Sequence, residues 1–168
     1  VWDQPITTAP QGWQLTGGPL VAKGKVMQGI GGQVKGGAYI VGLVSETGKE
    51  TWRYHSIARP DEPGGNTWNG IPLDQRSGGS IWTAPSYDPV LNLVFFGPAP
   101  TYDTGPLRNR VSTPGVTNDA LYTNSTVALN PDTGKLVWYY QHMPNDQWDF
   151  DWAVERQIVQ LRAAGGQT

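Results

Sequence analysis

The sequence contains no cysteine, and few of its 168 residues carry a charge. The absence of cysteine excludes disulfides, thiolate metal sites and cysteine nucleophiles. Charged residues make up 15% of the chain, the net charge is −2 and there is no basic run, so we expect no nucleic acid partner. No apolar run approaches the roughly 20 residues of a membrane-spanning helix, so we expect no membrane span.

Glycine, proline and large aromatic residues are abundant instead. The chain has 22 Gly, 14 Pro, 8 Trp and 7 Tyr. Glycine and proline are typical of turns, whereas Trp and Tyr favour strands and stacking surfaces over helices. The composition therefore predicts an all-β fold with many turns, and the length allows one domain over residues 1–168.

Short apolar segments indicate where strands form. Residues 21–28 are interpreted as one strand, and residues 38–44 and 93–96 as buried strands. The glycine-rich stretch at 29–37 is interpreted as a turn region, because it lacks the helix context and the Lys-Ser/Thr ending of a phosphate-binding loop. Residues 153–163 are compatible with either an amphipathic helix or a strand.

One turn-and-strand pattern occurs twice. A Thr-Gly-Lys turn at 47–49 is followed by Trp52, and the same turn at 133–135 is followed by Trp138 at the same offset. A glycine after threonine suits a hairpin turn that needs a positive φ. Repeated hairpins with a fixed Trp are typical of propeller blades, and two unrelated hairpins in a sandwich are the alternative.

These repeats define the expected architecture. We predict an incomplete β-propeller of about two to three four-stranded antiparallel blades with long loops. Blade-docking hairpins are expected near 38–54 and 120–140, with a loop-rich region at 55–118 between them. Long loops between short buried strands are where binding sites are usually built, so we expect the site to involve this region.

Residues 146–152 alternate acidic and aromatic side chains. If the segment is extended, Asp149 and Asp151 share one face, roughly 7 Å apart at about 3.3 Å per residue. The aromatic residues then share the other face, which can be buried as an anchor. Two such acids repel unless a cation lies between them or one keeps its proton. The spacing leaves open a hard-cation site, a base of raised pKa and a solvated acidic loop.

Further elements accompany the two repeats. They are Gly-Gly-Ser-Ile-Trp at 78–82, Tyr-Asp-Pro at 87–89, Asn-Ser at 124–125, and the segment at 140–149 that ends in Pro-x-Asp-x-Trp-Asp. Together, from about Gly12 to Val159, these elements resemble the pyrroloquinoline-quinone (PQQ) dependent alcohol dehydrogenases, the eight-bladed quinoprotein propellers.

The resemblance implies roles for several side chains. Trp82 matches the Trp that lies flat against the planar quinone in this family, and a core Trp is the alternative. Ser80 matches a neighbouring position close to the cofactor. Trp52 and Trp138 match the Trp residues that dock one blade on the next. Asp149 matches the catalytic base, which takes the proton of the substrate hydroxyl while hydride passes to the quinone.

The resemblance also implies a metal ion, either calcium or a lanthanide, that polarises the quinone. Asp149, Asp151 and Gln33 are the candidate ligands, and an acid at position 151 resembles the lanthanide-dependent members. The sequence departs from the family pattern at two positions. Gln33 stands where the family has Glu, and Pro100, which has no ligating side chain, stands where the family has Asn.

The expected function is that of a fragment of a PQQ-dependent dehydrogenase, oxidising alcohols or sugar-type hydroxyls in the periplasm or as a secreted protein. No signal peptide is present in the chain, and we expect a fragment that is inactive alone. The alternative is a non-catalytic propeller module that forms a homo-oligomer through open blade edges. A carbohydrate-binding sandwich would use exposed aromatic residues but leaves the repeats unexplained.

Overall fold

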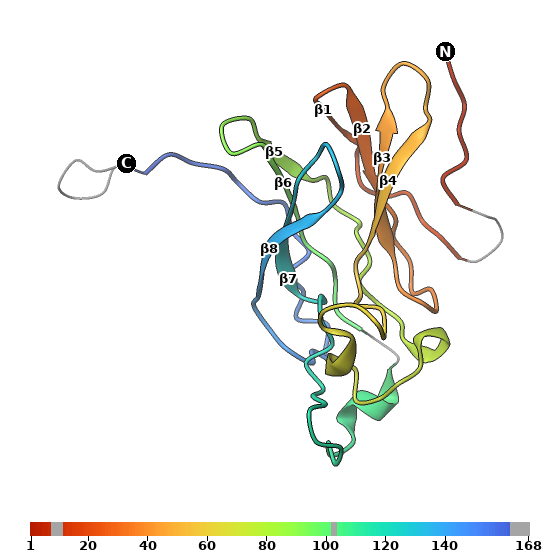
Figure 1. Ribbon diagram of the computed structural model, residues 1–168, viewed down its shortest axis with the longest axis vertical. Helices are drawn as coiled ribbons and strands as arrows, with labels where there is room; N and C mark the ends of the chain where they lie inside the picture. The colour runs from red at the N-terminus through yellow and green to blue at the C-terminus, as the bar shows by residue number, and fades with distance from the viewer. Residues whose placement is uncertain (8–11, 102–103, 162–168) are drawn as a thin grey trace.

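The computed structural model describes residues 1–7, 12–101 and 104–161 (Figure 1). Its regular elements are eight strands and three short 3₁₀ helices among the described residues: β1 (Leu20–Ala22), β2 (Lys25–Gly29), β3 (Tyr39–Val44), β4 (Glu50–His55), η1 (Gly65–Thr67), η2 (Leu73–Gln75), β5 (Ser86–Asp88), β6 (Leu93–Phe96), η3 (Gly105–Arg108), β7 (Ser125–Leu129) and β8 (Leu136–Gln141). Within this described part, no helix is long and apolar enough to cross a membrane.

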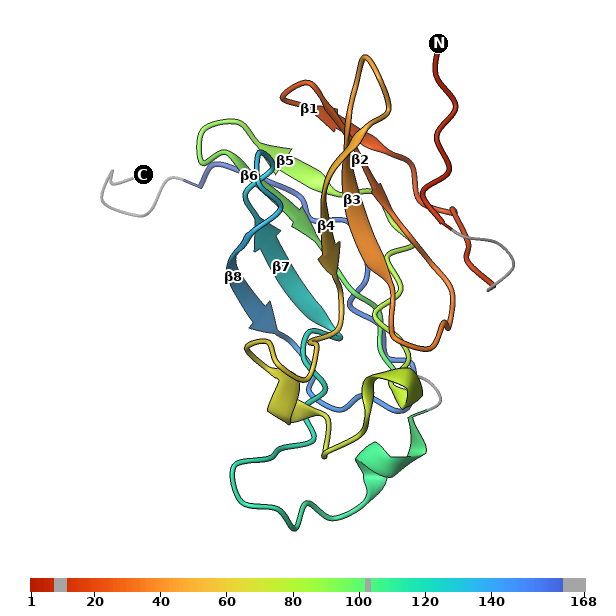
Figure 2. The ribbon, with the colours of Figure 1, turned by 45° about the vertical axis from the view of Figure 1, so that its right-hand side comes forward.

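The strands form two four-stranded antiparallel sheets, β1-β2-β3-β4 and β5-β6-β7-β8, each in sequence order. Figure 2 shows the two sheets side by side, with the long loops gathered beyond one end of them. The predicted all-β, incomplete propeller is therefore confirmed, with two blades in the described part of the chain. One strand prediction was wrong. Residues 21–28 form a hairpin, because Lys23 and Gly24 have φ of 53° and 66° and turn the chain between β1 and β2.

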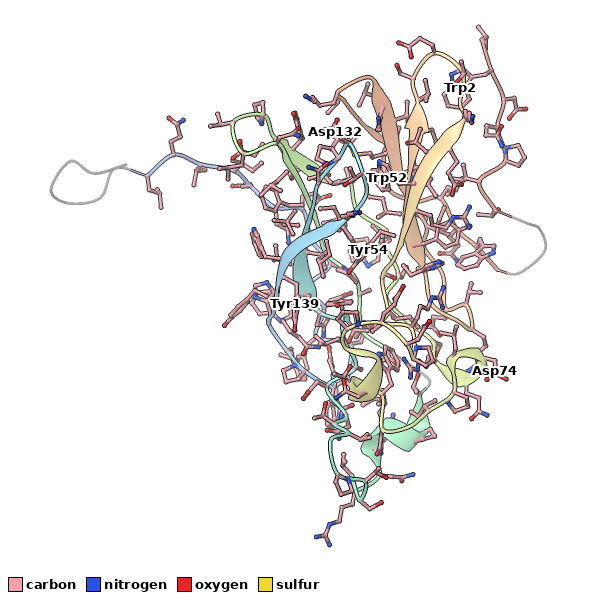
Figure 3. The ribbon with its side chains drawn as sticks, in the orientation of Figure 1. Trp2, Trp52, Tyr54, Asp74, Asp132 and Tyr139 are labelled. Carbon is pink, nitrogen blue, oxygen red and sulfur yellow. The ribbon has the colours of Figure 1, made fainter. Side chains whose placement is uncertain are left out.

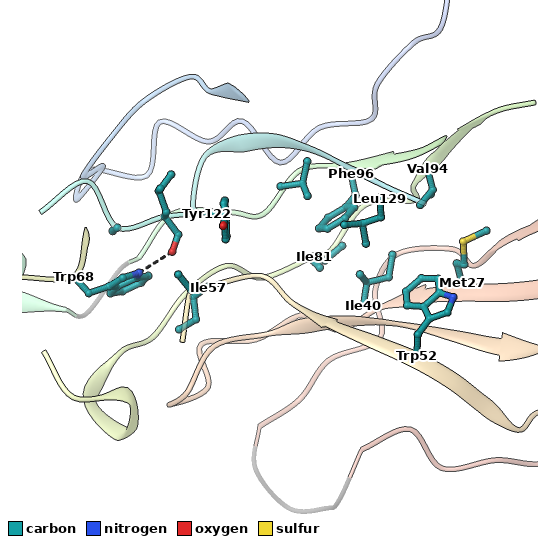
Figure 4. Packing of buried hydrophobic residues seen from close by; sticks show 14 of the residues in the cluster. Met27, Ile40, Trp52, Ile57, Trp68, Ile81, Val94, Phe96, Tyr122 and Leu129 are labelled. Atoms are coloured by element: carbon teal, nitrogen blue, oxygen red, sulfur yellow. Dashed lines mark hydrogen bonds between the residues drawn. The ribbon is translucent and has the colours of Figure 1, made fainter. Parts of the chain in front are cut away.

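The main core lies between the two sheets (Figure 4). Met27 and Ile40 of the first sheet pack in one cluster with Phe96 and Leu129 of the second, and Ile81 joins them from the loop before β5. Each such side chain contributes about 1.5–3 kcal/mol when it is fully buried. Because successive side chains of a strand point to opposite faces, each sheet also has a second face that points away from this core.

Both repeats form hairpins with the same local geometry. Gly42 pairs with Trp52 across β3 and β4, and Ala128 pairs with Trp138 across β7 and β8. Each pair is followed by a shift in register at the next residue of the first strand. The shared pattern of turn, bulge and Trp shows that the repeat in the sequence is a repeat in structure.

Trp52 joins the two sheets. Its indole Nε1 donates a hydrogen bond of 2.8 Å to the carbonyl of Pro131 in the β7–β8 turn, and the side chain is 7% exposed. Gly134 of the same turn has φ of +69°, and a Cβ there would lie 2.6 Å from the Trp52 ring. Figure 3 shows Trp52 beside this turn, where Asp132 is labelled. Glycine is therefore required both by the backbone and by the docked indole.

Trp2 repeats this arrangement on the first sheet. Its Nε1 donates to the carbonyl of Ser45 at 2.8 Å, and a Cβ on Gly48 would lie 2.5 Å from its ring. The outward face of that sheet, including Val41, is covered by Trp2, Ile6 and Trp13. The N-terminal segment therefore covers the outward face of the first sheet, while the second sheet covers its inward face.

The segment after residue 152 runs along the second sheet. Arg156 donates to the carbonyl of Ser125 at 2.9 Å and to Thr126 Oγ1 at 3.1 Å. Thr83 and Ser86 donate from their hydroxyls to backbone carbonyls of this segment. The described residues 153–161 form neither the helix nor the strand that the sequence allowed. Those two hydroxyls bind the carbonyls of Ala153 and Arg156 instead. Residues 162–163 lie outside the described part.

Candidate active site

One pocket gathers most of the predicted site residues. It has a volume of about 510 Å³ and is lined by Gln14, Gly32, Gln33, Ser80, Trp82 and Asp149. Gln33, Ser80, Trp82 and Asp149 come from three segments that are far apart in the sequence, and the fold brings them to the same cavity. Asp151 does not belong to this lining. The pocket joins one aromatic face to a carboxylate, two amides and a hydroxyl.

The Gly78-Gly79 pair positions Ser80 and Trp82. Both glycines have a positive φ, of 109° and 66°. A Cβ on Gly78 would lie 2.5 Å from the carbonyl oxygen of Pro100, and one on Gly79 would lie 2.5 Å from the hydroxyl of Ser56. Only glycine fits this tightly packed, left-handed turn. The next three residues therefore leave the turn in a fixed direction, which brings Ser80 and Trp82 to the pocket.

The opposite wall is built from the N-terminal segment and the glycine-rich turn. Gln14 and Gly31 exchange two backbone hydrogen bonds, of 3.0 and 2.7 Å. Gly32 N–H donates to Ser80 Oγ at 3.0 Å, which ties this wall to the Trp82 segment. Sequence reasoning missed Gln14 and Gly32. Their positions depend on contacts between distant loops, which no local sequence pattern indicates.

Asp146 organises the loop that carries Asp149. Its carboxylate is 1% exposed and accepts hydrogen bonds from the backbone N–H groups of Trp148 and Phe150, at 2.8 and 2.9 Å. It also accepts one from Asn124 Nδ2 at 2.7 Å. A carboxylate that binds amides two and four residues ahead closes a turn. The segment 146–152 is therefore turned rather than extended, and the condition for placing both acids on one face is not met.

Backbone dihedral angles confirm the turned conformation. Asp149 and Asp151 have φ of 64° and 57°, the left-handed region, so period-two alternation does not apply to them. The aromatic side chains are not buried together either, since Trp148 and Phe150 are 74% and 65% exposed. Trp152 stacks on the ring of His142, with centroids 4.6 Å apart. The aromatic residues of this loop therefore do not form a buried anchor.

The two acids differ in their surroundings. Asp149 is exposed and faces the pocket. Asp151 is half-buried, and its Oδ1 is buried without a hydrogen-bond partner among the described residues. Burial, and then the charges of Asp149 and Asp146, raise the pKa of the Asp151 carboxyl. A cation placed beside Asp151 would relieve this unfavourable environment.

Pro100 has a structural role. It is buried, and its carbonyl accepts a hydrogen bond of 3.4 Å from Gly79 N–H, so it supports the turn that leads to Trp82. Within the described ranges, no group of three or more His, Cys, Asp or Glu side chains could hold a metal ion. The oxygen donors that the chain itself brings to the pocket are therefore few, with Gln33 and Asp149 the main ones.

Comparison with known proteins gives this pocket a context. Residues 6–168 match the family described as "PQQ: Glucose/ethanol/alcohol dehydrogenase, beta-propeller domain". The chain belongs to this family. The quinohemoprotein alcohol dehydrogenase ADH IIB of Pseudomonas putida is 34% identical over 98% of this chain. That alignment covers 25% of the relative, so the chain spans about a quarter of the length of a relative that it matches.

Solved structures agree with the family assignment. The quinohemoprotein alcohol dehydrogenase of Comamonas testosteroni superposes with a TM-score of 0.71 at 31% identity, over 92% of this chain and 24% of that one. A europium-containing methanol dehydrogenase superposes with a TM-score of 0.69 at 28% identity, over 94% of this chain and 30% of that one. These relatives are quinoprotein or methanol dehydrogenases, and this chain shares a two-blade portion of their fold.

Proposed function

We propose that this chain carries part of the active site of a PQQ-dependent dehydrogenase that oxidises alcohols or sugar-type hydroxyls. The observation that carries the proposal is the convergence of Trp82, Ser80, Gln33 and Asp149 on one pocket of about 510 Å³. The quinone, when bound, supplies an oxidising group that accepts hydride. The pocket suits a flat, polar ring system because it joins an indole to oxygen donors.

Each residue has a distinct task in this proposal. Trp82, which is 38% exposed, offers its indole as a stacking surface. Asp149 is the base that takes the proton of the substrate hydroxyl. Ser80 holds the Gly32 turn through its hydroxyl oxygen, and that hydroxyl keeps its own proton to donate to a ligand. Asp146 positions Asp149 by holding the backbone on either side of it.

A calcium or lanthanide ion fits the site in part. The carboxylate of Asp149 and the amide oxygen of Gln33 are hard donors of the kind these ions prefer. Asp151, whose buried Oδ1 has no partner in the described part, is a third donor if the loop moves toward the pocket. The remaining ligands would come from the cofactor. The europium in one similar structure belongs to that protein, and it makes a lanthanide worth testing here.

The test is a graft into a complete propeller. The chain would replace the matching quarter of the P. putida relative, and alcohol-dependent dye reduction would be measured with bound PQQ quantified. Asp149→Asn should lower kcat by about 10²–10⁴-fold while PQQ remains bound, because a general base contributes about that much. A graft that binds PQQ and turns over equally well with and without Asp149 would refute the assigned base.

Gln33→Glu is the matching variant for the metal. It restores the carboxylate of the family pattern, and we expect it to tighten calcium binding in the graft without changing the pocket shape. An unchanged metal requirement would remove Gln33 from the proposed ligands. A periplasmic or secreted location accords with this function and stays a prediction.

A second function is favoured by the open face of the second sheet. Trp138, Tyr140 and Val159 are exposed on β8 and the segment beside it. A non-catalytic module that associates through this face would form an oligomer. Light scattering separates the two: a defined oligomer that dissociates on Trp138→Glu supports association, and a monomer at all concentrations contradicts it.

A further inference from the structure

The outward face of the second sheet presents the same indole that docks the first sheet on the second. Trp138 occupies in β8 the place that Trp52 occupies in β4, and its ring packs on Phe95 with centroids 5.7 Å apart. The side chain is 43% exposed, and the segment at 156–159 leaves a groove of about 280 Å³ beside it. In the described part of the chain, no carbonyl accepts the Trp138 indole N–H in the way that Pro131 accepts that of Trp52. This surface, the Trp138 face, therefore repeats the docking side chain without the turn that receives it.

The outward face of the first sheet repeats the opposite side of the same contact. Val127 and Leu129 of β7 are fully buried where the first sheet packs on the second, in the cluster that also contains Trp52. When the two hairpins are aligned on their Thr-Gly-Lys turns, Val41 and Leu43 of β3 stand at these positions. Both belong to a separate cluster beneath the N-terminal segment, on the side of the first sheet that faces away from the second. This surface is the Val41 face, formed by Val26, Val41 and Leu43.

Trp2 fills the turn beside the Val41 face as the Trp of another sheet would. Ser45 holds the position in the β3–β4 turn that Pro131 holds in the β7–β8 turn. The Trp2 indole donates to the Ser45 carbonyl at 2.8 Å, the same length as the bond that Trp52 makes to Pro131. Figure 3 shows Trp2 at this turn. Residues 1–7 form no helix or strand, so no ladder of backbone hydrogen bonds holds this segment on the sheet.

The Trp138 face and the Val41 face cannot meet within one chain. Figure 1 shows the first sheet between the N-terminal segment and the second sheet, so the two faces lie on opposite outer sides of the stack. Unlike surfaces that match each other and point in opposite directions make a head-to-tail contact between copies. Because the chain itself carries both halves of the contact, the partner inferred is a second copy. A whole sheet covers more apolar surface than the N-terminal segment does, which favours docking over the segment.

We propose that the Trp138 face of one copy docks on the Val41 face of a second copy, with the Trp138 indole on the Ser45 carbonyl in place of Trp2. Trp2 is then a cap, because only the fraction of chains that has released it can bind. This inference rests on the association proposed above as the second function, and it names the partner surface and the regulator. It does not involve the pocket of Trp82 and Asp149.

The test is sedimentation velocity on the whole chain over a wide range of concentrations. Wild type should associate reversibly, and Trp2→Ala should lower the dissociation constant about five- to tenfold, because a hydrogen bond and a packed ring no longer hold the cap. The double variant Trp2→Ala/Trp138→Glu should be monomeric. Trp148→Ala is the control, since it removes a Trp that is 74% exposed and belongs to neither face, and it should associate like wild type.

A mixture of two variants tests the head-to-tail arrangement itself. Val26→Glu places a charge on the Val41 face at a half-buried position, and Trp138→Glu places one on the Trp138 face. Each variant alone should remain monomeric, with the far-UV circular dichroism of wild type. An equimolar mixture should form a dimer that grows no further, because each variant keeps one intact face and the two intact faces match.

Three results would overturn this inference. An oligomer that Trp138→Glu abolishes but Val26→Glu leaves intact would refute the Val41 face as acceptor while keeping the association of the second function. A mixture that restores no dimer would do the same, since two Trp138 faces would then be packing on each other. A dissociation constant that Trp2→Ala leaves unchanged would refute the cap, and a monomer at every concentration in both wild type and Trp2→Ala would refute the association as well.

Discussion

The two sheets carry the same repeated hairpin, yet their Trp residues end in opposite surroundings. Trp52 is buried against the β7–β8 turn, whereas Trp138 at the matching position is 43% exposed. The outward face of the first sheet is covered by the N-terminal segment, and that of the second is covered only in part by residues 156–159. The motif therefore specifies a Trp that can dock, but the Trp is buried only where the turn of a following sheet receives it.

The largest expected effect separates the two Trp residues. Trp52→Ala should lower the free energy of unfolding by about 3–5 kcal/mol, because a large buried ring and its bond to Pro131 are lost. Trp138→Ala should cost only about 1–2 kcal/mol in this chain, because its ring is 43% exposed and packs on Phe95. Urea unfolding measures both. Equal losses would show that Trp138 is docked in solution and would break the comparison.

The turn that receives Trp52 should be nearly as sensitive. Gly134→Ala places a Cβ against the Trp52 ring at a positive φ, so we expect a loss of about 2–4 kcal/mol from backbone strain and overpacking together. Gly115→Ala is the control, because its φ of +75° is similar and no atom lies within 4 Å of the added Cβ. Thermal unfolding that ranks the two variants equally would exclude a packing contribution from Trp52.

A smaller effect is expected where the N-terminal segment covers the first sheet. Trp2 is only half-buried and belongs to a terminal segment, so Trp2→Ala should cost about 1–2 kcal/mol. Hydrogen exchange should speed up around β3, the strand whose outward face Trp2 covers. Unchanged protection at β3 would mean that the segment does not stabilise this sheet.

The smallest expected effect is the pH dependence of stability that Asp151 causes. The pKa of Asp151 is raised in the folded chain, so the folded state binds this proton more tightly than the unfolded state does. Its unfavourable contribution is absent below the unfolded pKa of about 3.9 and grows as the pH rises through the folded pKa. Asp151→Asn should therefore raise stability by a few tenths of a kcal/mol at neutral pH, after solvent screening, and leave it unchanged at the acid end. A gain that is equal at all pH values would exclude this origin.

Local patterns predicted the parts of the fold that depend on neighbouring residues. The Thr-Gly-Lys turns and their Trp residues were visible because turn chemistry and strand spacing are local. The hairpin of β1 and β2 was missed because Lys23 adopts a left-handed conformation, which is uncommon for lysine. Coverage of the first sheet by Trp2 and Trp13 was also missed, since it is a contact between distant segments.

The candidate site shows the same division. Resemblance to the family identified Trp82, Ser80, Gln33 and Asp149, and the structure brings these four to one pocket. Alternation could not decide between an extended segment and a loop at 146–152, because the turn depends on Asp146, which is held by Asn124, 22 positions away. The one local signal for that turn was Asp146 itself, because Asp side chains often accept hydrogen bonds from backbone N–H groups a few residues ahead.

The most direct test of the proposed site is a titration of the purified chain with PQQ, followed by Trp fluorescence, first with calcium and then with a lanthanide. We expect saturable quenching that requires the metal, is lost in Trp82→Phe as the stacked fluorophore disappears, and weakens in Asp149→Asn. Trp148→Phe, outside the pocket lining, is the matched control and should retain the metal-dependent quenching. The absence of quenching with either metal, or quenching that persists without Trp82, would contradict the assignment of this pocket to the quinone.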